Sequence, residues 1–169
     1  MIAFGEANIE INGAASNNIS VIGNFLLNPR NAGSRGQNVQ SWPASPSSPN
    51  TNITVSDNYT LSSTDTNIYP YPENQEDSLN FGFTNGIVAQ NNYLTGGHIS
   101  SGCGIIADEA ANSAQFLNNS LSNTGQCGIG IASGTNQTIA GNKILRFFAD
   151  GAAKKWPLRG SLKPGVGCL

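Results

Sequence analysis

The chain has 169 residues, a formal net charge of −2 and only 11% charged residues, well below the roughly 25% of an average globular protein. The few basic residues are scattered, which argues against nucleic-acid binding because phosphate backbones are held by clustered lysine and arginine. No apolar run is long enough to span a bilayer, and MIAFGEANIE at the start has too short an apolar part for a signal peptide. These properties predict one domain rich in β-structure, with no nucleic-acid or membrane partner.

Short segments with apolar residues at alternate positions recur along the chain. Alternation of period two is typical of strands with one buried face. Such strands are predicted at residues 8–11 (NIEI), 38–41 (NVQS, the weakest match), 80–83 (NFGF), 104–107 (GIIA) and 128–131 (GIGI).

A segment with a central asparagine follows each of these strands. The five segments cover residues 18–27, 52–61, 86–95, 113–122 and 137–146. Their central residue is Asn24, Asn58, Asn92, Asn119 or Asn142, which is the seventh residue of the first four segments and the sixth of the last, and it is always preceded by Gly, Asp or Asn. An apolar or small residue stands three positions earlier, and Leu, Thr or Ile stands two positions later. The asparagines are 34, 34, 27 and 23 residues apart, which indicates a repeat near 23 residues with insertions.

A repeat of this length that contains short strands predicts a β-solenoid. Each unit would supply three strands, and each strand would pair in parallel with its equivalent about 4.8 Å away. The residue before each asparagine would make the bend in left-handed geometry, and the stacked asparagines would form a hydrogen-bonded ladder. We expect an all-β, single-domain solenoid of about five coils over residues 1–146. Residues 147–169 leave the repeat, either as a cap that uses Phe147, Phe148 and Trp156 or as a disordered tail.

The pattern G-I-x-I…N-x-x-I-x-G-N-x-I at residues 128–144 resembles the repeats of right-handed parallel β-helix proteins. That superfamily includes pectate lyases, polygalacturonases, alginate epimerases and phage tailspike depolymerases. The resemblance covers residues 8–146 and implies a right-handed parallel β-helix. It also implies an acidic or neutral polysaccharide as ligand, bound in a groove along one long face. Such relatives are mostly secreted, so the resemblance favours a secreted or cell-surface location.

Insertions between the repeats are where we expect function to lie. Residues 28–38, 62–80 and 95–102 should leave the same corner of successive coils, and residues 42–51 form a further loop that opens with Trp42. The chemically useful side chains of these insertions are Arg30, Arg35, Trp42, Asp65, Tyr69, Tyr71, Glu73, Glu76, Asp77 and His98.

These residue types suit carbohydrate chemistry. Trp42, Tyr69 and Tyr71 are candidate platforms on which sugar rings stack. The candidate catalytic residues are Glu73, Glu76, Asp77, Arg30, Arg35 and His98, because paired carboxylates hydrolyse glycosides and arginines hold uronate carboxylates. Asp65, Glu73 and Asp77 are candidate Ca²⁺ ligands, and no other cofactor is expected. The alternative is that residues 62–80 form an ordinary solvated acidic loop.

His98 lies in GGHISSG, which resembles the Gly-His-Gly segment of polygalacturonases. The other polygalacturonase motifs and the Asp-Pro-His motif of alginate epimerases are absent from the sequence, so no catalytic residue is carried over from either family. A surface histidine is the alternative. Asp108 and Glu109 lie at a different corner and are predicted to form a polar turn.

Cys103 and Cys127 are 24 residues apart, one coil length, and therefore occupy the same register. Continuing the alternation from Ile105 and Ile129 predicts that both side chains point inward. A disulfide is geometrically possible between such neighbours, but we expect two buried thiols.

Two functions are consistent with these features. The first is a carbohydrate-interacting protein, with a small or truncated polysaccharide lyase or hydrolase as its enzymatic form. The second is a non-catalytic structural or assembly module, because an open solenoid end exposes unpaired strand edges through which copies can associate end to end.

Overall fold

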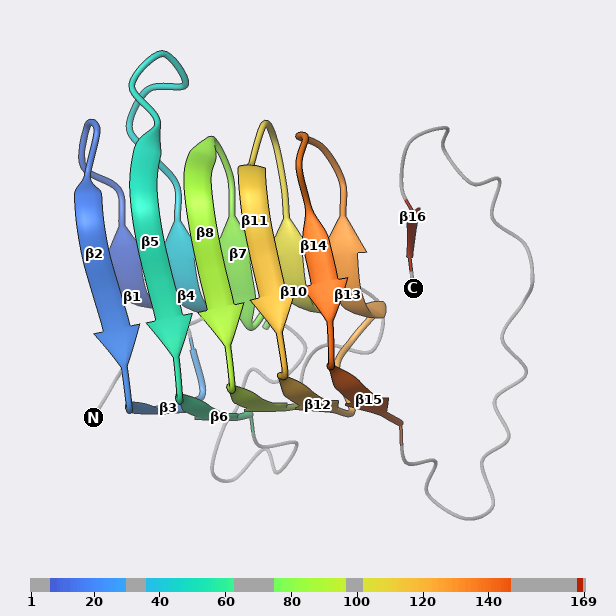
Figure 1. Cartoon of the computed structure of the whole chain (residues 1–169). Coiled ribbons are helices and arrows are strands. Elements are labelled where there is room, and N and C mark those ends of the chain that lie inside the picture. Colours follow the sequence, from blue (N-terminus) through green and yellow to red (C-terminus); the bar gives the residue numbers. More distant parts are fainter. Residues whose placement is uncertain (1–6, 30–35, 63–74, 97–101, 147–166, 169) are drawn as a thin grey trace.

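The computed structural model describes residues 7–29, 36–62, 75–96, 102–146 and 167–168. Within these ranges the chain forms strands, turns and loops and contains no helix, so no helix there is long and apolar enough to cross a membrane. The strands wind into a parallel β-solenoid with three faces (Figure 1). The prediction of an all-β parallel solenoid is therefore confirmed.

Three sheets form the faces, and each takes one strand from every turn of the chain. Sheet A contains the parallel strands Ala7–Ile11 (β1), Gln37–Ser41 (β4), Leu79–Phe81 (β7), Cys103–Ala107 (β10) and Cys127–Ile131 (β13). Sheet B contains Asn17–Ile22 (β2), Asn50–Ser56 (β5), Thr84–Gln90 (β8), Asn112–Leu117 (β11) and Thr138–Ala140 (β14). Sheet C contains Phe25–Leu27 (β3), Tyr59–Leu61 (β6), Tyr93–Thr95 (β9), Ser120–Ser122 (β12) and Lys143–Leu145 (β15).

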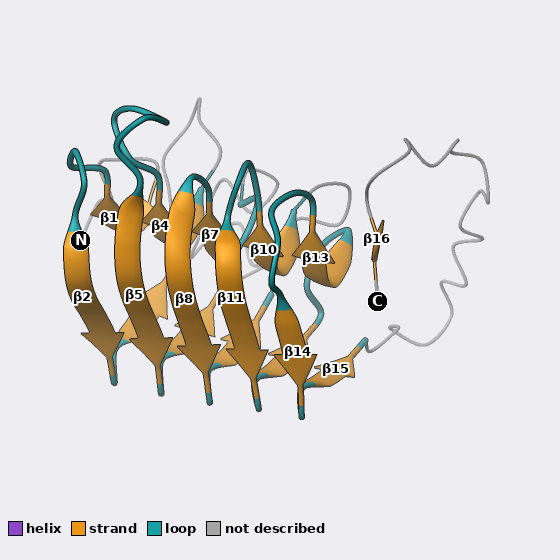
Figure 2. Cartoon of the chain, turned by 45° about the horizontal axis from the view of Figure 1, so that its top comes forward, coloured by secondary structure: helices purple, strands orange, loops and turns teal. Residues whose placement is uncertain are grey.

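Sheets A and B face each other, and the short strands of sheet C close one edge of the space between them (Figures 1 and 2). This space is filled by stacked apolar side chains. Val21, Val55, Ala89 and Phe116 are paired in register along sheet B, as the repeat predicts. Phe116 also packs against Phe81 of sheet A, with ring centroids 6.1 Å apart. The central side chains are fully buried, so the core runs along the solenoid axis.

The predicted asparagine ladder is present at the corner between sheets B and C. The backbone N–H and the Nδ2 of Asn58 both donate to Oδ1 of Asn92, at 3.1 and 3.0 Å, and Nδ2 also donates to the Val21 carbonyl at 2.9 Å. The same paired donation to the next ladder oxygen is repeated at Asn24, Asn92 and Asn119, and the ladder ends at Asn142. Each internal amide therefore connects three successive turns. The residues before these asparagines have positive φ, between 55° and 70°, which confirms the predicted left-handed bends.

Cys103 and Cys127 are paired in register, as predicted, but they are joined by a disulfide, so the expectation of two free thiols is wrong. Their predicted inward orientation is also wrong. A Cβ at Gly104 would meet Leu121 and one at Gly128 would meet Ile144, so these glycines face the interior. A Cβ at Gly130 would lie 3.2 Å from Sγ of Cys103 and 3.3 Å from Sγ of Cys127, beside the partly exposed Ile106. The two inward glycines interrupt the alternation and turn the sulfur atoms toward the outer face of sheet A.

The two ends of the solenoid differ in the part of the chain that the structure describes. Gly167–Cys168 (β16) pairs antiparallel with β13 and covers the C-terminal edge of sheet A. At the other end β1, β2 and β3 have a strand partner on one side only. The proposed capping residues Phe147, Phe148 and Trp156 lie outside the described residues.

Candidate functional site

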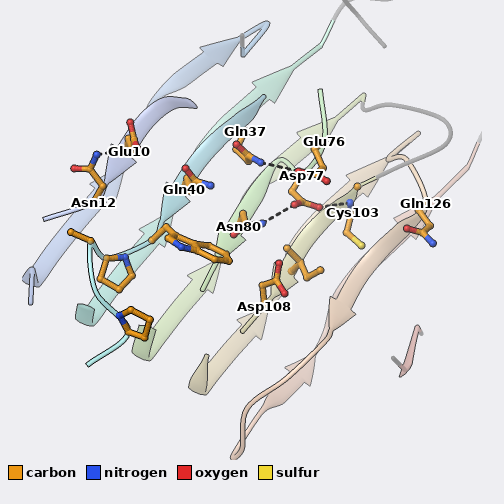
Figure 3. Close-up of a pocket in the computed structure, with 16 residues that line it drawn as sticks. Glu10, Asn12, Gln37, Gln40, Glu76, Asp77, Asn80, Cys103, Asp108 and Gln126 are labelled. Carbon is orange, nitrogen blue, oxygen red and sulfur yellow. Dashed lines mark hydrogen bonds between the residues drawn. The ribbon is translucent and has the colours of Figure 1, made fainter. Parts of the chain in front are cut away.

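A groove of about 850 Å³ runs across the outer face of sheet A (Figure 3). Residues of β1, β4, β7 and β10 and of the loops that flank these strands line it. Its polar lining consists of Glu10, Asn12, Gln37, Gln40, Glu76, Asp77, Asn80, Asp108 and Gln126. Its apolar lining includes Trp42, Pro43, Ala44, Pro46 and Ile106.

The middle of the groove is built by one outward position of each strand. Glu10, Gln40, Asn80 and Ile106 are paired in register on β1, β4, β7 and β10. Their sequence neighbours point into the core, so these four side chains are presented outward side by side. Neighbouring strands are about 4.8 Å apart, so the row presents one side chain at each strand spacing across the groove.

Asp77 precedes β7 and is buried at one side of the groove, with 4% of its surface exposed. Its Oδ1 accepts a hydrogen bond from the Cys103 backbone N–H at 2.6 Å, and its Oδ2 accepts one from Asn80 Nδ2 at 2.8 Å. Burial raises the pKa of Asp77 to about 6, although the hydrogen bonds from Asn80 and Cys103 favour the charged form. The neighbouring carboxylates of Glu76 and Asp108 raise this pKa further. Both oxygens of Asp77 are thus engaged in holding the groove together.

Two amide side chains in the groove are oriented by carboxylates. Gln37 donates through Nε2 to Glu76 Oε2 at 3.2 Å, as Asn80 does to Asp77. The remaining amide oxygens, Gln37 Oε1 and Asn80 Oδ1, are buried and accept no hydrogen bond from any described residue. A buried acceptor without a donor is costly. Both oxygens are closed to solvent, so a ligand or water could donate to them only after the side chains move.

Trp42 follows β4 and is half-buried at the other side of the groove. Its six-membered ring lies against Gly82, where a Cβ would come within 2.3 Å of Cζ3 and 2.4 Å of Cε3. The ring of Phe83 contacts it edge to face, with centroids 5.5 Å apart. Glycine at position 82 therefore makes the room in which the indole lies, and the indole is fixed as part of the groove wall.

The described lining of the groove is acidic. Glu10, Glu76, Asp77 and Asp108 line it, and none of its described lining residues is Lys, Arg or His. Asp108 comes directly after β10, at the opposite end of the sheet A strands from Asp77. Asp77 and Asp108 were predicted to lie at different corners, and this placement agrees with that prediction. The groove extends from one corner to the other and contains both residues.

The structure brings together three of the residues predicted from sequence, because Glu76, Asp77 and Trp42 all line the groove. Arg30, Arg35, Asp65, Tyr69, Tyr71, Glu73 and His98 lie outside the described residues. The insertions that contain them do leave one corner, as predicted. Asn28 donates to the Leu61 carbonyl, Ser62 to the Thr95 carbonyl and Gly96 to the Ser122 carbonyl, which aligns the three exits from sheet C.

Sequence reasoning missed Glu10, Gln37, Gln40, Asn80 and Asp108 as groove residues. The usable signal was a polar residue flanked by two apolar ones, such as Glu10 between Ile9 and Ile11 and Asn80 between Leu79 and Phe81. These positions share a direction but no residue type, so they do not stand out as a motif.

A second row of exposed side chains lies on sheet C. Phe25, Tyr59 and Tyr93 stack with centroids 5.2 and 5.0 Å apart and nearly parallel planes. The rings cover one another's faces, so Tyr59 has no open face on which a sugar can stack. This row is separate from the groove, because none of its residues lines it.

No protein-family model matches the chain, and no curated protein or solved structure matches it significantly. The proposals below therefore depend on the residues of the groove and on the fold.

Proposed function

We propose that the protein binds an oligosaccharide in the groove on the outer face of sheet A, with Trp42 as the main stacking surface. The observation that carries this proposal is the combination of a fixed, half-buried indole with rows of carboxylates and amides in one elongated groove. Sugars present apolar ring faces to aromatic side chains and hydroxyl groups to polar ones, so they need both kinds of contact.

The fold makes the groove rigid, which favours binding. Its middle row stands on four hydrogen-bonded parallel strands, and the Cys103–Cys127 disulfide joins β10 to β13 beside it. A preformed site loses little conformational entropy when a ligand binds. Both oxygens of Asp77 already accept hydrogen bonds, so we assign this residue a structural role in the groove and propose binding as the primary function.

The test is isothermal titration calorimetry with a panel of neutral, acidic and amino-sugar oligosaccharides of matched length, followed by an assay for new reducing ends or unsaturated products. Trp42→Ala should weaken binding by about tenfold or more, which corresponds to 1.4 kcal/mol. Tyr93→Ala is the matched control, because it removes an exposed aromatic ring from sheet C and should leave affinity unchanged. Alanine variants of Tyr69 and Tyr71 test whether those residues also contribute. Binding to no member of the panel, or equal affinity of wild type and Trp42→Ala, would contradict the proposal.

The second candidate function is assembly through the N-terminal end of the solenoid. A cavity of about 510 Å³ at this end is lined by Ile9, Ile11, Ile19 and Val21, and the edges of β1, β2 and β3 there lack a described partner. Light scattering across a concentration series tests this function. An Ile19→Asp variant should shift any oligomer to monomer, and a wild-type chain that stays monomeric throughout would contradict it.

A further inference from the structure

The chemistry of the groove points to the class of sugar that it accepts. We propose that the groove selects amino sugars, as cationic oligomers, over neutral and acidic oligosaccharides. This inference rests on the proposed sugar-binding function and specifies its substrate class.

The first argument is the charge of the lining. Carboxylates that can attract a cation come from three separate parts of the groove, with Glu10 on β1, Glu76 before β7 and Asp108 after β10. Asp77 is not counted among them, because it is buried and both its oxygens already accept hydrogen bonds. No Lys, Arg or His accompanies them among the described lining residues. A groove lined by one sign of charge concentrates ligands of the opposite sign and repels ligands of the same sign. A uronate oligomer would bring its carboxylates next to these acids, whereas protonated amines would be attracted to them.

The second argument is the orientation of the buried amides. Glu76 and Asp77 accept hydrogen bonds from the NH₂ groups of Gln37 and Asn80, so these two amides do not direct a donor toward a ligand. Those oxygens, Gln37 Oε1 and Asn80 Oδ1, belong to side chains only 3% and 4% exposed and have no donor in the described part of the chain. Both side chains line the groove beside the carboxylates that orient them (Figure 3). Gln37 and Asn80 thus direct their N–H groups toward Glu76 and Asp77 and away from a ligand. This side of the groove presents acceptors, which suits a ligand rich in N–H and O–H donors.

The third argument is the spacing of the acids. Glu10 lies on β1 and Asp108 directly follows β10, and these two strands are three strand spacings apart, about 14 Å in all. One strand spacing is close to the length of one β-linked pyranose unit, so successive units of an extended oligomer can follow successive strands. An extended polycation with one amine on each unit fits carboxylates distributed in this way. The Trp42 indole, which lies against Gly82, offers an apolar surface that suits a pyranose ring better than an aliphatic polyamine.

The experiment compares oligomers of glucosamine, N-acetylglucosamine and galacturonic acid of equal length by calorimetry, at a mildly acidic pH that protonates the amines. Spermine serves as a cationic probe without sugar rings. We expect glucosamine oligomers to bind about tenfold or more tightly than N-acetylglucosamine oligomers, and we expect added salt to reduce that difference. Galacturonate oligomers should bind weakest.

The double variant Glu10→Gln and Asp108→Asn should bring the affinity for glucosamine oligomers down to that for the acetylated ones. Asp57→Asn is the control for loss of a carboxylate as such, because it removes one negative charge from an exposed corner outside the groove. Thermal unfolding of both variants verifies that they are folded.

Three outcomes would overturn the inference in different ways. If acetylated or acidic oligomers bound as tightly as glucosamine oligomers, the selectivity would be wrong while the sugar-binding function would stand. If spermine bound as tightly as the glucosamine oligomer, the groove would be a general polycation site. If no oligomer bound, the proposed function itself would fail, and the inference would fail with it.

Discussion

The carboxylate of Asp77 accepts a 2.6 Å hydrogen bond from the backbone N–H of Cys103, and this bond ties the approach to β7 to the first residue of β10. The same carboxylate accepts from Asn80, so one buried acid positions two neighbouring parts of the groove. The disulfide from Cys103 to Cys127 extends this connection to β13.

We predict that Asp77 makes stability depend on pH. Burial raises its folded pKa from 3.8 to about 6, so between these values the folded chain keeps a proton that the unfolded chain has released. The stability from this group is complete below about pH 4 and is lost as pH rises to about 6, by on the order of 2–3 kcal/mol. The side chain of the Asp77→Asn variant cannot ionise, so this variant should not lose stability in that way as pH rises.

The measurement is the free energy of unfolding in urea, for variant and wild type, at intervals between pH 4 and 7. The difference between the two chains isolates Asp77, because the other carboxylates contribute equally to both. The introduced amide can still accept from Cys103, and Asn80 can turn its unpartnered oxygen toward the new NH₂ group. A difference that stays constant across the pH range would show that the carboxyl group does not titrate as described.

The asparagine ladder should contribute more stability at its centre than at its end. Asn92→Ala leaves the N–H and Nδ2 of Asn58 without their acceptor and the Val55 carbonyl without its donor, all in the buried interior. We expect a loss of about 3–5 kcal/mol in the free energy of unfolding, because each unpaired buried group costs about 1–3 kcal/mol. Asn24→Ala, at the partly exposed end of the ladder, should cost about 1 kcal/mol and is the matched control. The free energies of unfolding are measured by chemical denaturation. Equal losses in the Asn92→Ala and Asn24→Ala variants would contradict the prediction that the centre of the ladder contributes more than its end.

Reduction of the disulfide should destabilise the solenoid. The bond closes a segment with a sequence separation of 24 residues, for which the loss of loop entropy in the unfolded chain corresponds to about 3 kcal/mol. The measurement is unfolding of a Cys168→Ser chain with and without reductant, since that background removes the third thiol and prevents exchange. Alkylation of the unreduced, unfolded wild-type chain should label one cysteine of three. Labelling of all three would show that the bond is absent.

Gly82→Ala should displace Trp42. The new Cβ would lie within 2.4 Å of two indole carbons, so the ring must move away, at a cost of about 1–3 kcal/mol in stability. In a Trp156→Phe background Trp42 is the only tryptophan, and its emission should shift in the variant. Gly13→Ala is the control, because its Cβ would meet only the hydroxyl of Ser16, which can rotate away. An unchanged emission spectrum would mean that the indole does not lie against Gly82.

The fold was predictable because every turn of a solenoid repeats the same local structure and therefore the same residue pattern. Every turn needs a left-handed bend between sheets B and C and an amide that satisfies backbone groups of the turns beside it. Gly, Asp or Asn followed by Asn therefore recurs at this one corner of each turn, as at Asn58 and Asn92. The apolar positions around the ladder follow from the same register, and Val55 and Leu94 are buried as that register requires.

The groove was less predictable because outward positions are not constrained by the core. Glu10, Gln40, Asn80 and Ile106 share a register position but differ in chemistry, and no single-sequence pattern connects them. Trp42, Glu76 and Asp77 were recognisable as aromatic or acidic residues in insertions. The orientation of Cys103 was mispredicted because Gly104 faces the interior, which strict alternation does not anticipate.

The most direct test of the groove as a sugar site is to titrate the Trp156→Phe chain with the best-binding oligosaccharide while following the emission of Trp42. The account predicts a saturable change whose midpoint agrees with the calorimetric affinity, and no change in a Trp42→Phe chain that retains Trp156. Calorimetric binding without any change in Trp42 emission would place the sugar elsewhere on the molecule and contradict the account.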